Sequence, residues 1–356
     1  SYGPPTDSAL RLRERMEVAK GKVVVNVGFY ASFPSKVEEI DEIVEAGAIG
    51  FKVNPFQPLL ALDVEDDTVL SRAFERAAGV DTVVAVHAEK RSLVRRLEER
   101  LKGLGDASVQ AYLRAHPPRA EVEDVERAIR LAREARVRVH FSHISTSSAV
   151  SLIIKARGEG VRVSSEATPH NLLLSEETLS RLGGEAIMDP PLRSRAETTR
   201  LFEAVVKGDI DIVASDHAPH SLGEKRGESV WEVRPGVPGL ETTLPVLLTM
   251  VNDGRLTINR LIKLLAQRPA QIFRLGGKGF LGPGYDADLT VVDLKESYTI
   301  DPSEFHSKAK YSPFRGWRAV GRPVKTLVGG RVVMEEGEVI SSRGDGDILG
   351  CILCEC

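Results

Sequence analysis

In the 356-residue sequence, residues 210–220 hold a dense group of ionisable side chains that could take part in catalysis or metal binding. The apolar run Ile212-Val213-Ala214 ends in Ser215-Asp216-His217-Ala218-Pro219-His220. An apolar run of this length indicates a buried strand. Ionisable side chains at the end of such a strand are costly to bury unless they have partners or a metal. The stretch therefore predicts either a site placed where a strand stops or a polar turn after a core strand.

Two further histidines follow apolar runs in the same way. His87 comes directly after the run 82–86, and His143 lies two residues after the run 137–141. Two histidines and a carboxylate from separate strands are standard ligands of Zn²⁺. One such histidine is more often a hydrogen-bonded core residue than a ligand. His87 and His143 together with Asp216, all at equivalent strand ends, predict a metal site.

Lys52 stands inside the apolar segment Gly50-Phe51-Lys52-Val53. A buried ammonium group at a cationic site would be unfavourable. Carbamylation by CO₂ would turn the side chain into an anion that can bridge two metals. The alternative is a structural ion pair with Asp216 or Glu89. The residues alone favour the ion pair.

These residues need elements to position them, and short apolar runs alternate with helical segments from residue 23 to residue 216. This alternation indicates βα units and a parallel sheet. Lys52, His87, His143 and Asp216 lie at the carboxyl ends of different strands, where a (β/α)₈ barrel forms its active site. A doubly wound sheet would bind ligands at one switch point. The predicted strands are 23–27, 48–53, 82–86, 137–141, 161–164 and 212–214; the predicted helices between them are 36–45, 66–78, 93–104, 122–135, 147–157 and 197–206.

The predicted fold class is α/β, a (β/α)₈ TIM-type barrel with a small C-terminal β appendage. Six units are too few for a closed barrel of eight, so we expect the first strands to be missing from this chain. We expect the incomplete barrel to span 1–275, with an opening helix at 8–20 capped by Thr6 or Asp7 and helices near 241–252 and 257–265. A β-sandwich-type appendage should follow at 276–340, with a hairpin turn at Gly329-Gly330. The tail 341–356 has no pattern and is expected to be mobile.

The composition excludes several classes of protein. With 42% hydrophobic and 28% charged residues and a net charge of −3, the chain predicts a globular protein without a nucleic-acid footprint. It contains no apolar run of membrane-spanning length and no signal peptide at its start. All three cysteines, Cys351, Cys354 and Cys356, lie in the last six residues. The body without cysteine fits a reducing cytoplasm, and we read C-x-x-C-x-C as a frayed tail in preference to a metal site.

Seven segments of the sequence together carry a family resemblance. They are V-H-A-E (86–89), F-S-H-I-S-T (141–146), E-A-T-P-H-N-L (166–172), D-P-P-L-R-S (189–194), A-S-D-H-A-P-H (214–220), V-P-G-L-E-T (237–242) and G-Y-D-A-D-L (284–289). In this order they resemble the amidohydrolase superfamily and, within it, the dihydroorotases of the cyclic-amidohydrolase group. Two more segments agree with this: F-H-S-K-A-K-Y-S-P-F-R-G-W (305–317) resembles a dihydroorotase C-terminal signature, and G-F-K (50–52) resembles the segment with the carbamylated lysine. The resemblance implies that the TIM-type barrel is of the metal-dependent hydrolase kind.

The resemblance implies a role for each matched residue. Carbamylated Lys52 would bridge two Zn²⁺ ions, and His87 and His143 would bind one of them. Asp216 would bind the other metal and act as general base and acid. The substrate would contact His220, Pro238 and Gly239, while His217 is expected to be structural. The substrate contacts also include Asp189.

The implied reaction is the reversible cyclisation of N-carbamoyl-L-aspartate to dihydroorotate in pyrimidine synthesis. A hydroxide bridging two metals is a strong nucleophile at neutral pH, and a metal polarises the ring amide carbonyl. Asp216 would take the proton of the nucleophile and return it to the leaving nitrogen.

The chain departs from the family pattern in three places. The family's first strand carries His-x-His followed by an Arg, yet no histidine precedes His87 here. The family's Pro-Asn-Thr loop should fall at residues 1–5, where its Asn is absent, and Asp189 stands where relatives place Asn or Arg. The set for one metal (Lys52, His87, His143) is complete, whereas the other metal has only Lys52 and Asp216. We therefore expect an N-terminal segment to be missing and the 356 residues alone to be weakly active or inactive.

Two other functions stay open. The first is a sister enzyme, an allantoinase or hydantoinase, which uses the same metals on another cyclic amide. The second is a catalytically impaired homologue that serves as a structural partner. Candidate protein partners are a second copy of the chain and aspartate carbamoyltransferase; nucleic acid and membrane are not expected.

Overall fold

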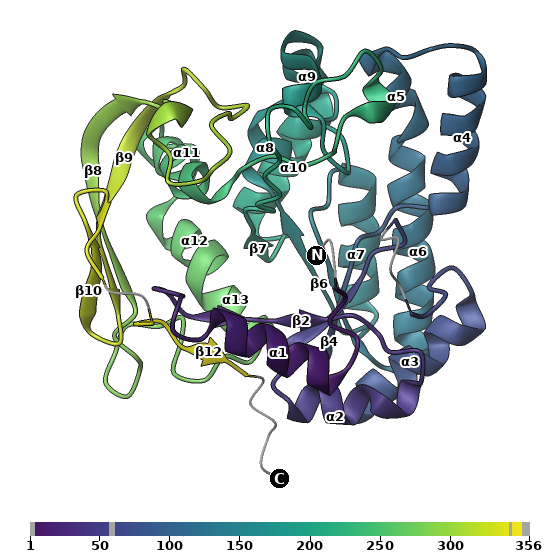
Figure 1. Ribbon diagram of the computed structural model, residues 1–356, viewed down its shortest axis with the longest axis horizontal. Coiled ribbons are helices and arrows are strands. Elements are labelled where there is room, and N and C mark those ends of the chain that lie inside the picture. The colour runs from purple at the N-terminus through teal and green to yellow at the C-terminus, as the bar shows by residue number, and fades with distance from the viewer. Residues whose placement is uncertain (1–3, 57–60, 342–343, 351–356) are drawn as a thin grey trace.

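The computed structural model describes residues 4–56, 61–341 and 344–350. At its centre lies a six-stranded parallel sheet whose strands follow the order of the chain, β2-β3-β4-β5-β6-β7 (Figure 1). Consecutive strands are neighbours throughout, which is the connectivity of a (β/α) barrel. The strands are β2 Tyr30–Ala31, β3 Gly50–Val53, β4 Val83–Val86, β5 Arg138–Phe141, β6 Val163–Ala167 and β7 Ile212–Val213.

Helices connect these strands, as parallel pairing requires. In Figure 1, α3, α6 and α7 stand side by side along one face of the sheet. Each predicted helix between the strands is present, and α5, α8 and α9 are additional. The helices before β7 are α1 Ala9–Ala19, α2 Ile40–Glu45, α3 Asp67–Gly79, α4 Arg91–Gly103, α5 Val109–Ala115, α6 Pro118–Ala135, α7 Ser147–Gly158, α8 Pro169–Leu173, α9 Glu176–Leu182 and α10 Arg195–Lys207, with 3₁₀ turns at Val37–Glu39 and Gly183–Ala186.

A row of paired apolar residues crosses the centre of the sheet. Phe51 pairs with Val84, Val84 pairs with Val139, and Val139 pairs with Val163. All four side chains are buried. A parallel sheet covered on both faces needs apolar residues without alternation, which explains why its strands read as continuous apolar runs.

Polar side chains fix where helices begin. The carboxylate of Asp66 accepts hydrogen bonds from two backbone N–H groups of the first turn of α3, as an N-cap residue does. Ser8 caps α1 by accepting from the backbone N–H of Arg11. The prediction of Thr6 or Asp7 as this cap is wrong, because Asp7 instead pairs with the guanidinium of Arg11 at 2.6 Å.

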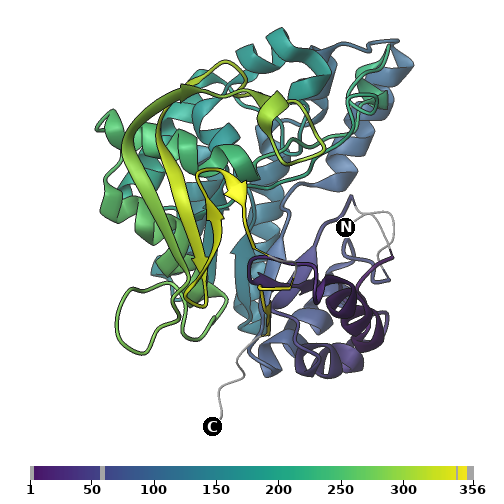
Figure 2. The same cartoon turned by 60° about the vertical axis from the view of Figure 1, so that its left-hand side comes forward.

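The C-terminal part forms a second sheet. Its four antiparallel strands have the order β11-β10-β9-β8, and Figure 2 brings this sheet forward. Helices lie between it and the parallel sheet (Figure 1). The helices are α11 Leu240–Asn252, α12 Ile258–Ile262, a π-helical turn Lys263–Gln267 and α13 Arg268–Ile272, with 3₁₀ turns at Val230–Glu232 and Pro302–Glu304. The strands are β8 Leu289–Thr299, β9 Arg318–Val328, β10 Arg331–Glu335 and β11 Glu338–Val339.

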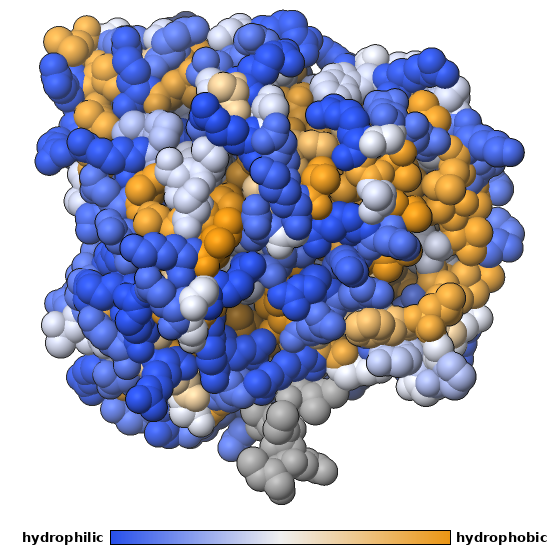
Figure 3. All heavy atoms as spheres, turned by 180° about the vertical axis from the view of Figure 1, so that it is seen from behind, coloured by the Kyte–Doolittle hydropathy of each residue, from blue (hydrophilic) through white to orange (hydrophobic). Residues whose placement is uncertain are grey.

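The predicted hairpin at Gly329-Gly330 is confirmed. Val328 pairs with Arg331 across it, and both glycines have positive φ, 54° and 81°, as a tight hairpin turn between twisted strands requires. Within the described part of 276–340, the strands form a single sheet. Seen from behind, hydrophobic residues gather over this side of the molecule (Figure 3), and exposed apolar residues of the sheet include Val291 and Val339.

One expectation about the start of the described chain is wrong. The run 23–27 is not a barrel strand: Val25 is exposed, and only Val27 joins β1 (Val27–Gly28). This strand pairs in parallel with β12 (Ile348–Leu349), so the tail contains regular structure. Asn26 Oδ1 accepts a hydrogen bond from the backbone N–H of Asp347 at 2.8 Å and supports the pairing. The sequence could not predict this pair, because two residues form each strand. The cysteines at 351, 354 and 356 and part of the loop 55–58 lie outside the described residues.

In the described part of the chain, no helix is long and apolar enough to cross a membrane.

Candidate active site

The predicted metal ligands gather at the carboxyl edge of the parallel sheet. Lys52 lies in β3, His87 follows β4 directly, and His143 and Asp216 follow β5 and β7 within three residues. Backbone hydrogen bonds continue the sheet past the strand ends: the N–H of His87 donates to Val53 O at 2.8 Å. Because the strands are parallel, these ends meet on one side of the sheet.

Three of these side chains line one cavity of about 620 Å³. Lys52, His143 and Asp216 face it together with Glu166 of β6. His87 is not part of the lining and reaches the group through His143. The structure therefore assembles the predicted residues around a shared space, with Glu166 as an addition.

Lys52 does not form the ion pair considered as an alternative. Its Nζ donates a hydrogen bond to Ser142 Oγ at 2.6 Å. Among the described residues, neither Asp216 nor Glu89 lies within ion-pair distance of it. Burial lowers the pKa of Lys52, while the Glu166 and Asp216 carboxylates act in the opposite direction. An uncharged amine is the form that reacts with CO₂.

The two histidines face each other through their ring nitrogens. His87 Nδ1 and His143 Nε2 are 3.2 Å apart. Two nitrogens that bind one tetrahedral Zn²⁺ at about 2.0–2.1 Å would be about 3.3 Å apart. Burial, followed by the nearby His87 and Lys52, lowers the pKa of His143 well below its usual range. A neutral imidazole is the form that binds metals, so the pair fits a divalent cation.

Two residues of the site have strained backbone. His143 and Asp216 have positive φ angles of 37° and 43°, in the left-handed region that residues other than glycine rarely adopt. Such strain concentrates at functional sites, where the surrounding structure has to maintain it. Burial raises the pKa of Asp216, and Lys52 opposes this.

Glu166 is a member of the site that the sequence reasoning missed. Its Oε2 lies 3.0 Å from His140 Nε2, and its Oε1 accepts from the backbone N–H of His143 at 3.2 Å. Burial raises the pKa of Glu166, but the hydrogen bond and charge of His140 outweigh it and leave the pKa lowered. A charged residue within a buried strand was the available signal.

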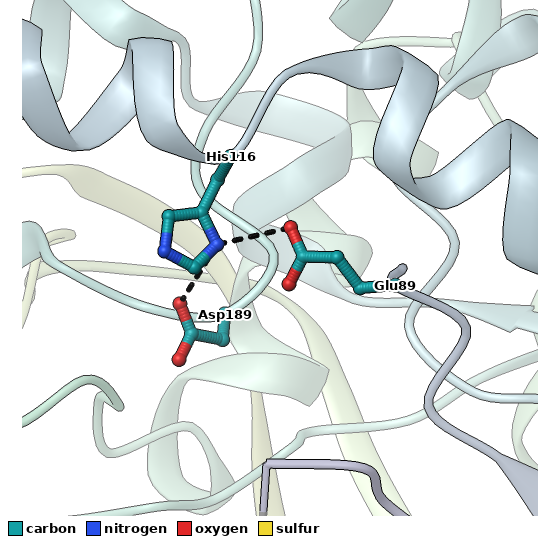
Figure 4. Close-up of side chains that lie close together, drawn as sticks. All are labelled: Glu89, His116 and Asp189. Carbon is teal, nitrogen blue, oxygen red and sulfur yellow. Dashed lines mark hydrogen bonds and ion pairs between the residues drawn. The ribbon is translucent and has the colours of Figure 1, made fainter. Parts of the chain in front are cut away.

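A second cluster adjoins His87 and was also missed. Glu89, His116 and Asp189 lie close together (Figure 4), each offering a ligand atom within 4.8 Å of the others. His116 Nδ1 is 3.0 Å from Glu89 Oε1 and 3.8 Å from Asp189 Oδ1. Asp189 also accepts a hydrogen bond from Tyr112. The sequence distance between these residues gives no motif, so only the fold reveals the cluster.

The cluster carries its own positive charge. Burial lowers the pKa of His116, but Glu89 and Asp189 outweigh it and raise the pKa to about 10. Without a metal, a protonated His116 would balance the charge of the two carboxylates. The other oxygen of Glu89 lies 3.4 Å from His87 Nε2. A carboxylate behind a metal-binding histidine orients its ring, and Glu89 is placed to do this.

Three of the four predicted substrate contacts lie on the segment after β7, and the fourth, Asp189, belongs to the cluster beside His87. His220 is buried, with Nε2 3.1 Å from Pro235 O. Gly239 is the N-cap residue of α11. A Cβ at this position would lie 2.4 Å from Ser215 O, so only glycine permits this close approach beside Asp216. His217 Nδ1 accepts from the backbone N–H of Gly239 at 3.1 Å, so its ring links the segment after β7 to the start of α11. Pro238 directly precedes Gly239 on the same segment.

Lys225 ties this segment to the segment of Asp189. Its Nζ donates to the carbonyls of Ile187, Arg234 and Gly236 at 2.8, 2.7 and 2.9 Å. The side chain is only 1% exposed. Three acceptors match the three donors of an ammonium group. Sequence reasoning missed Lys225, because a lysine in a polar loop is usually exposed.

Comparison with known proteins decides the family. The model of the Amidohydrolase family matches residues 5–333. The chain belongs to the amidohydrolase family. It is 38% identical over 341 residues to a dihydroorotase of Methanothermobacter thermautotrophicus, covering 96% of this chain and 76% of that one. It is also 35% identical to an L-hydantoinase of Paenarthrobacter aurescens, with 97% and 77% covered, and 34% identical to an allantoinase of Rubrobacter xylanophilus, with 95% and 75% covered.

The solved structures of this family agree with the fold. An L-hydantoinase from Arthrobacter aurescens superimposes with a TM-score of 0.93 at 35% identity, covering 98% of this chain and 78% of that one. A dihydropyrimidinase from Brevibacillus agri gives 0.89 at 26% identity, with 98% and 78% covered. The predicted α/β fold class is confirmed.

Proposed function

We propose that this amidohydrolase opens and closes a cyclic amide, and that its substrate pair is N-carbamoyl-L-aspartate and dihydroorotate. One observation carries the proposal. In a chain of the amidohydrolase family, two histidine nitrogens face each other at 3.2 Å beside Lys52 at the carboxyl edge of a parallel sheet. The 305–317 segment and the relative with 38% identity favour dihydroorotate among the cyclic amides.

His87 and His143 would hold a Zn²⁺ ion, with carbamylated Lys52 as an anionic ligand shared with a second ion. Bound Zn²⁺ would activate water and polarise the amide carbonyl. Ser142 holds Lys52 Nζ toward the cavity, and Glu89 orients the ring of His87. Asp216 would hold the second ion.

Asp216 would move the proton. Its carboxylate accepts a proton from the attacking water and returns it to the ring nitrogen as the C–N bond breaks. The same steps in reverse close the ring, with water as the leaving group. His220, Pro238, Gly239 and Asp189 would form the substrate wall, which Lys225 keeps in place. We place the reaction in the cytoplasm, with a small-molecule substrate.

Two alternatives share part of this argument. A hydantoinase or allantoinase is favoured by the similar sequence identities of such relatives, 35% and 34%. It is also favoured by Asp189, because dihydroorotate carries a carboxylate that the carboxylate of Asp189 would repel. A structural partner, as a homo-oligomer or with aspartate carbamoyltransferase, would need neither a metal nor turnover.

The test is a comparison of three rings with the complete gene product loaded with Zn²⁺. We expect kcat/KM for dihydroorotate to exceed that for hydantoin and allantoin by about tenfold or more. A preference for hydantoin or allantoin would support a cyclic amide hydrolase but reject dihydroorotate as its substrate. Zinc binding without turnover of any ring would reject the hydrolase, and absence of both would favour the structural partner.

A further inference from the structure

A second cavity lies at the opposite end of the parallel sheet. It has a volume of about 420 Å³, and its floor contains Val83, Val139 and Val163 at the amino ends of β4, β5 and β6. No carboxylate is among its lining residues in the part of the chain that the structure describes. Five arginines line it: Arg138, Arg157, Arg162, Arg268 and Arg274.

Two of these arginines share one aspartate. Asp81 pairs with Arg162 at 2.6 Å and also with Arg274. The side chain of Arg162 is 47% exposed and that of Arg274 is 31% exposed. One carboxylate therefore balances two guanidinium groups that stay open to the cavity.

A second aspartate is shared in the same way. Asp211 pairs with Arg157 and with Arg268, each at 2.6 Å. Its carboxylate is only 4% exposed and also accepts from the backbone N–H of Ser165 at 3.0 Å. Each of these arginines uses its Nη2 for the pair, and Arg268 Nη1 also donates to Gln271 Oε1 at 2.9 Å. A guanidinium group has five N–H donors, so donors remain on both arginines for a ligand.

We propose that this cavity binds a small anion with several phosphate charges. Without Arg138, the lining has four guanidinium groups, and Asp81 and Asp211 supply two carboxylates. Two positive charges in a partly enclosed space are therefore left for a ligand to balance. Arginine matches phosphate oxygens through paired N–H groups. The volume falls in the range of small-molecule sites, and Ser164 and Gln271 add polar groups to the lining.

The site is separate from the proposed active site. Lys52 and Asp216 lie at the carboxyl ends of the strands, whereas the arginines lie at the amino ends. The segment 268–274 stands between the two cavities: Pro269 and Phe273 line the inner one, and Arg268 and Arg274 line the outer one. An anion bound by these two arginines would hold this segment, so its backbone amides should exchange hydrogen more slowly.

The experiment titrates pyrophosphate into the full chain at low salt by calorimetry, with hydrogen exchange of 268–274 as the second readout. We expect saturable one-to-one binding. Arg162→Gln combined with Arg274→Gln should weaken it by about tenfold or more, because two phosphate contacts are lost. The control, Arg195→Gln with Arg200→Gln, removes the same charge from exposed pairs on α10 and should change it by less than about twofold.

Asp81→Asn removes no guanidinium group and tests the site even if the double variant fails to fold. It frees two arginines from their carboxylate, so pyrophosphate should bind about threefold more tightly or better. Three results would overturn the proposal: no saturable binding to the wild type, equal loss in the control pair, or tighter binding of citrate than of pyrophosphate. Unchanged exchange in 268–274 on saturation would also contradict it.

Discussion

The two ends of the parallel sheet use polar residues in opposite ways. At the carboxyl edge, the polar groups are buried and have specific partners: Lys52 Nζ donates to Ser142 Oγ, and the backbone of His143 and Asp216 is held in the left-handed region. At the amino edge, arginines share aspartates in pairs. One end is thus built from specific, costly contacts, whereas the other is built from redundant ones.

This difference predicts where single substitutions matter. When a substitution removes one partner of a buried hydrogen bond, the other partner stays buried without a hydrogen bond, which is costly. A partly exposed ion pair contributes little, because water and the second arginine replace what is lost. The following variants test this contrast, from the largest expected effect to the smallest.

Asp216→Asn should lower kcat for ring opening by about 10³-fold, because an amide cannot transfer the proton. Asn tolerates the positive φ of this position, so the fold should persist. The measurement is steady-state turnover of the preferred ring, with Asp253→Asn at the exposed end of α11 as control. A loss below about tenfold in a folded protein would remove Asp216 from the mechanism.

Lys225→Met should lower the free energy of unfolding by roughly 3 kcal/mol, since three carbonyls lose their buried donor. The substrate wall should loosen as well, which would raise KM more than it lowers kcat. Urea unfolding at neutral pH measures the first effect, and Lys207→Met on the exposed face of α10 is the matched control. If both variants unfold at the same urea concentration, Lys225 does not hold the loop.

His116→Gln tests the charged cluster through its pH dependence. The folded pKa of His116 is raised from 6.5 to about 10, so its contribution is fully present below pH 6.5 and is lost as the pH rises through 10. We expect the variant to be less stable than the wild type by roughly 2 kcal/mol at pH 6.5 and by less near pH 10.

Denaturant unfolding at these two pH values measures the difference. His306→Gln, which removes an exposed imidazole outside the cluster, is the control. If the difference in the free energy of unfolding between wild type and variant grew with pH, His116 would be neutral in the folded protein.

The smallest effect is expected at the amino edge. Arg162→Gln with Arg274→Gln, without added anion, should change the free energy of unfolding by less than about 1 kcal/mol, because the pairs with Asp81 are partly exposed. Thermal and urea unfolding should agree on this. A loss above about 2 kcal/mol would show that this edge is as specific as the other.

Sequence reasoning predicted the elements whose signals are local. The apolar runs before His87, His143 and Asp216 gave the strands, and a polar residue directly after a buried strand pointed to the carboxyl edge. The predicted helix 66–78 begins at Asp66, which the structure shows to be the N-cap residue of α3. These features depend on a few adjacent residues and need no knowledge of the fold.

The features that sequence reasoning could not predict depend on contacts between segments that are distant in the sequence. His116 meets Glu89 through the packing of the loop before α6, and Lys225 meets the carbonyl of Ile187 across 38 residues. The pairing of β1 with β12 joins residues 27 and 348. Each of these residues would be equally acceptable on the surface by its type and neighbours, so no local pattern marks it.

The most direct test of the central claim is the zinc content of the full chain after dialysis, by mass spectrometry, for the wild type, His143→Ala and His116→Gln. If His87 and His143 form the metal site, the wild type retains about one zinc per chain or more. His143→Ala should then lose the ion that the two histidines share, and His116→Gln should keep it. Zinc that survives His143→Ala but disappears in His116→Gln would place the metal at Glu89, His116 and Asp189 and contradict the proposed active site.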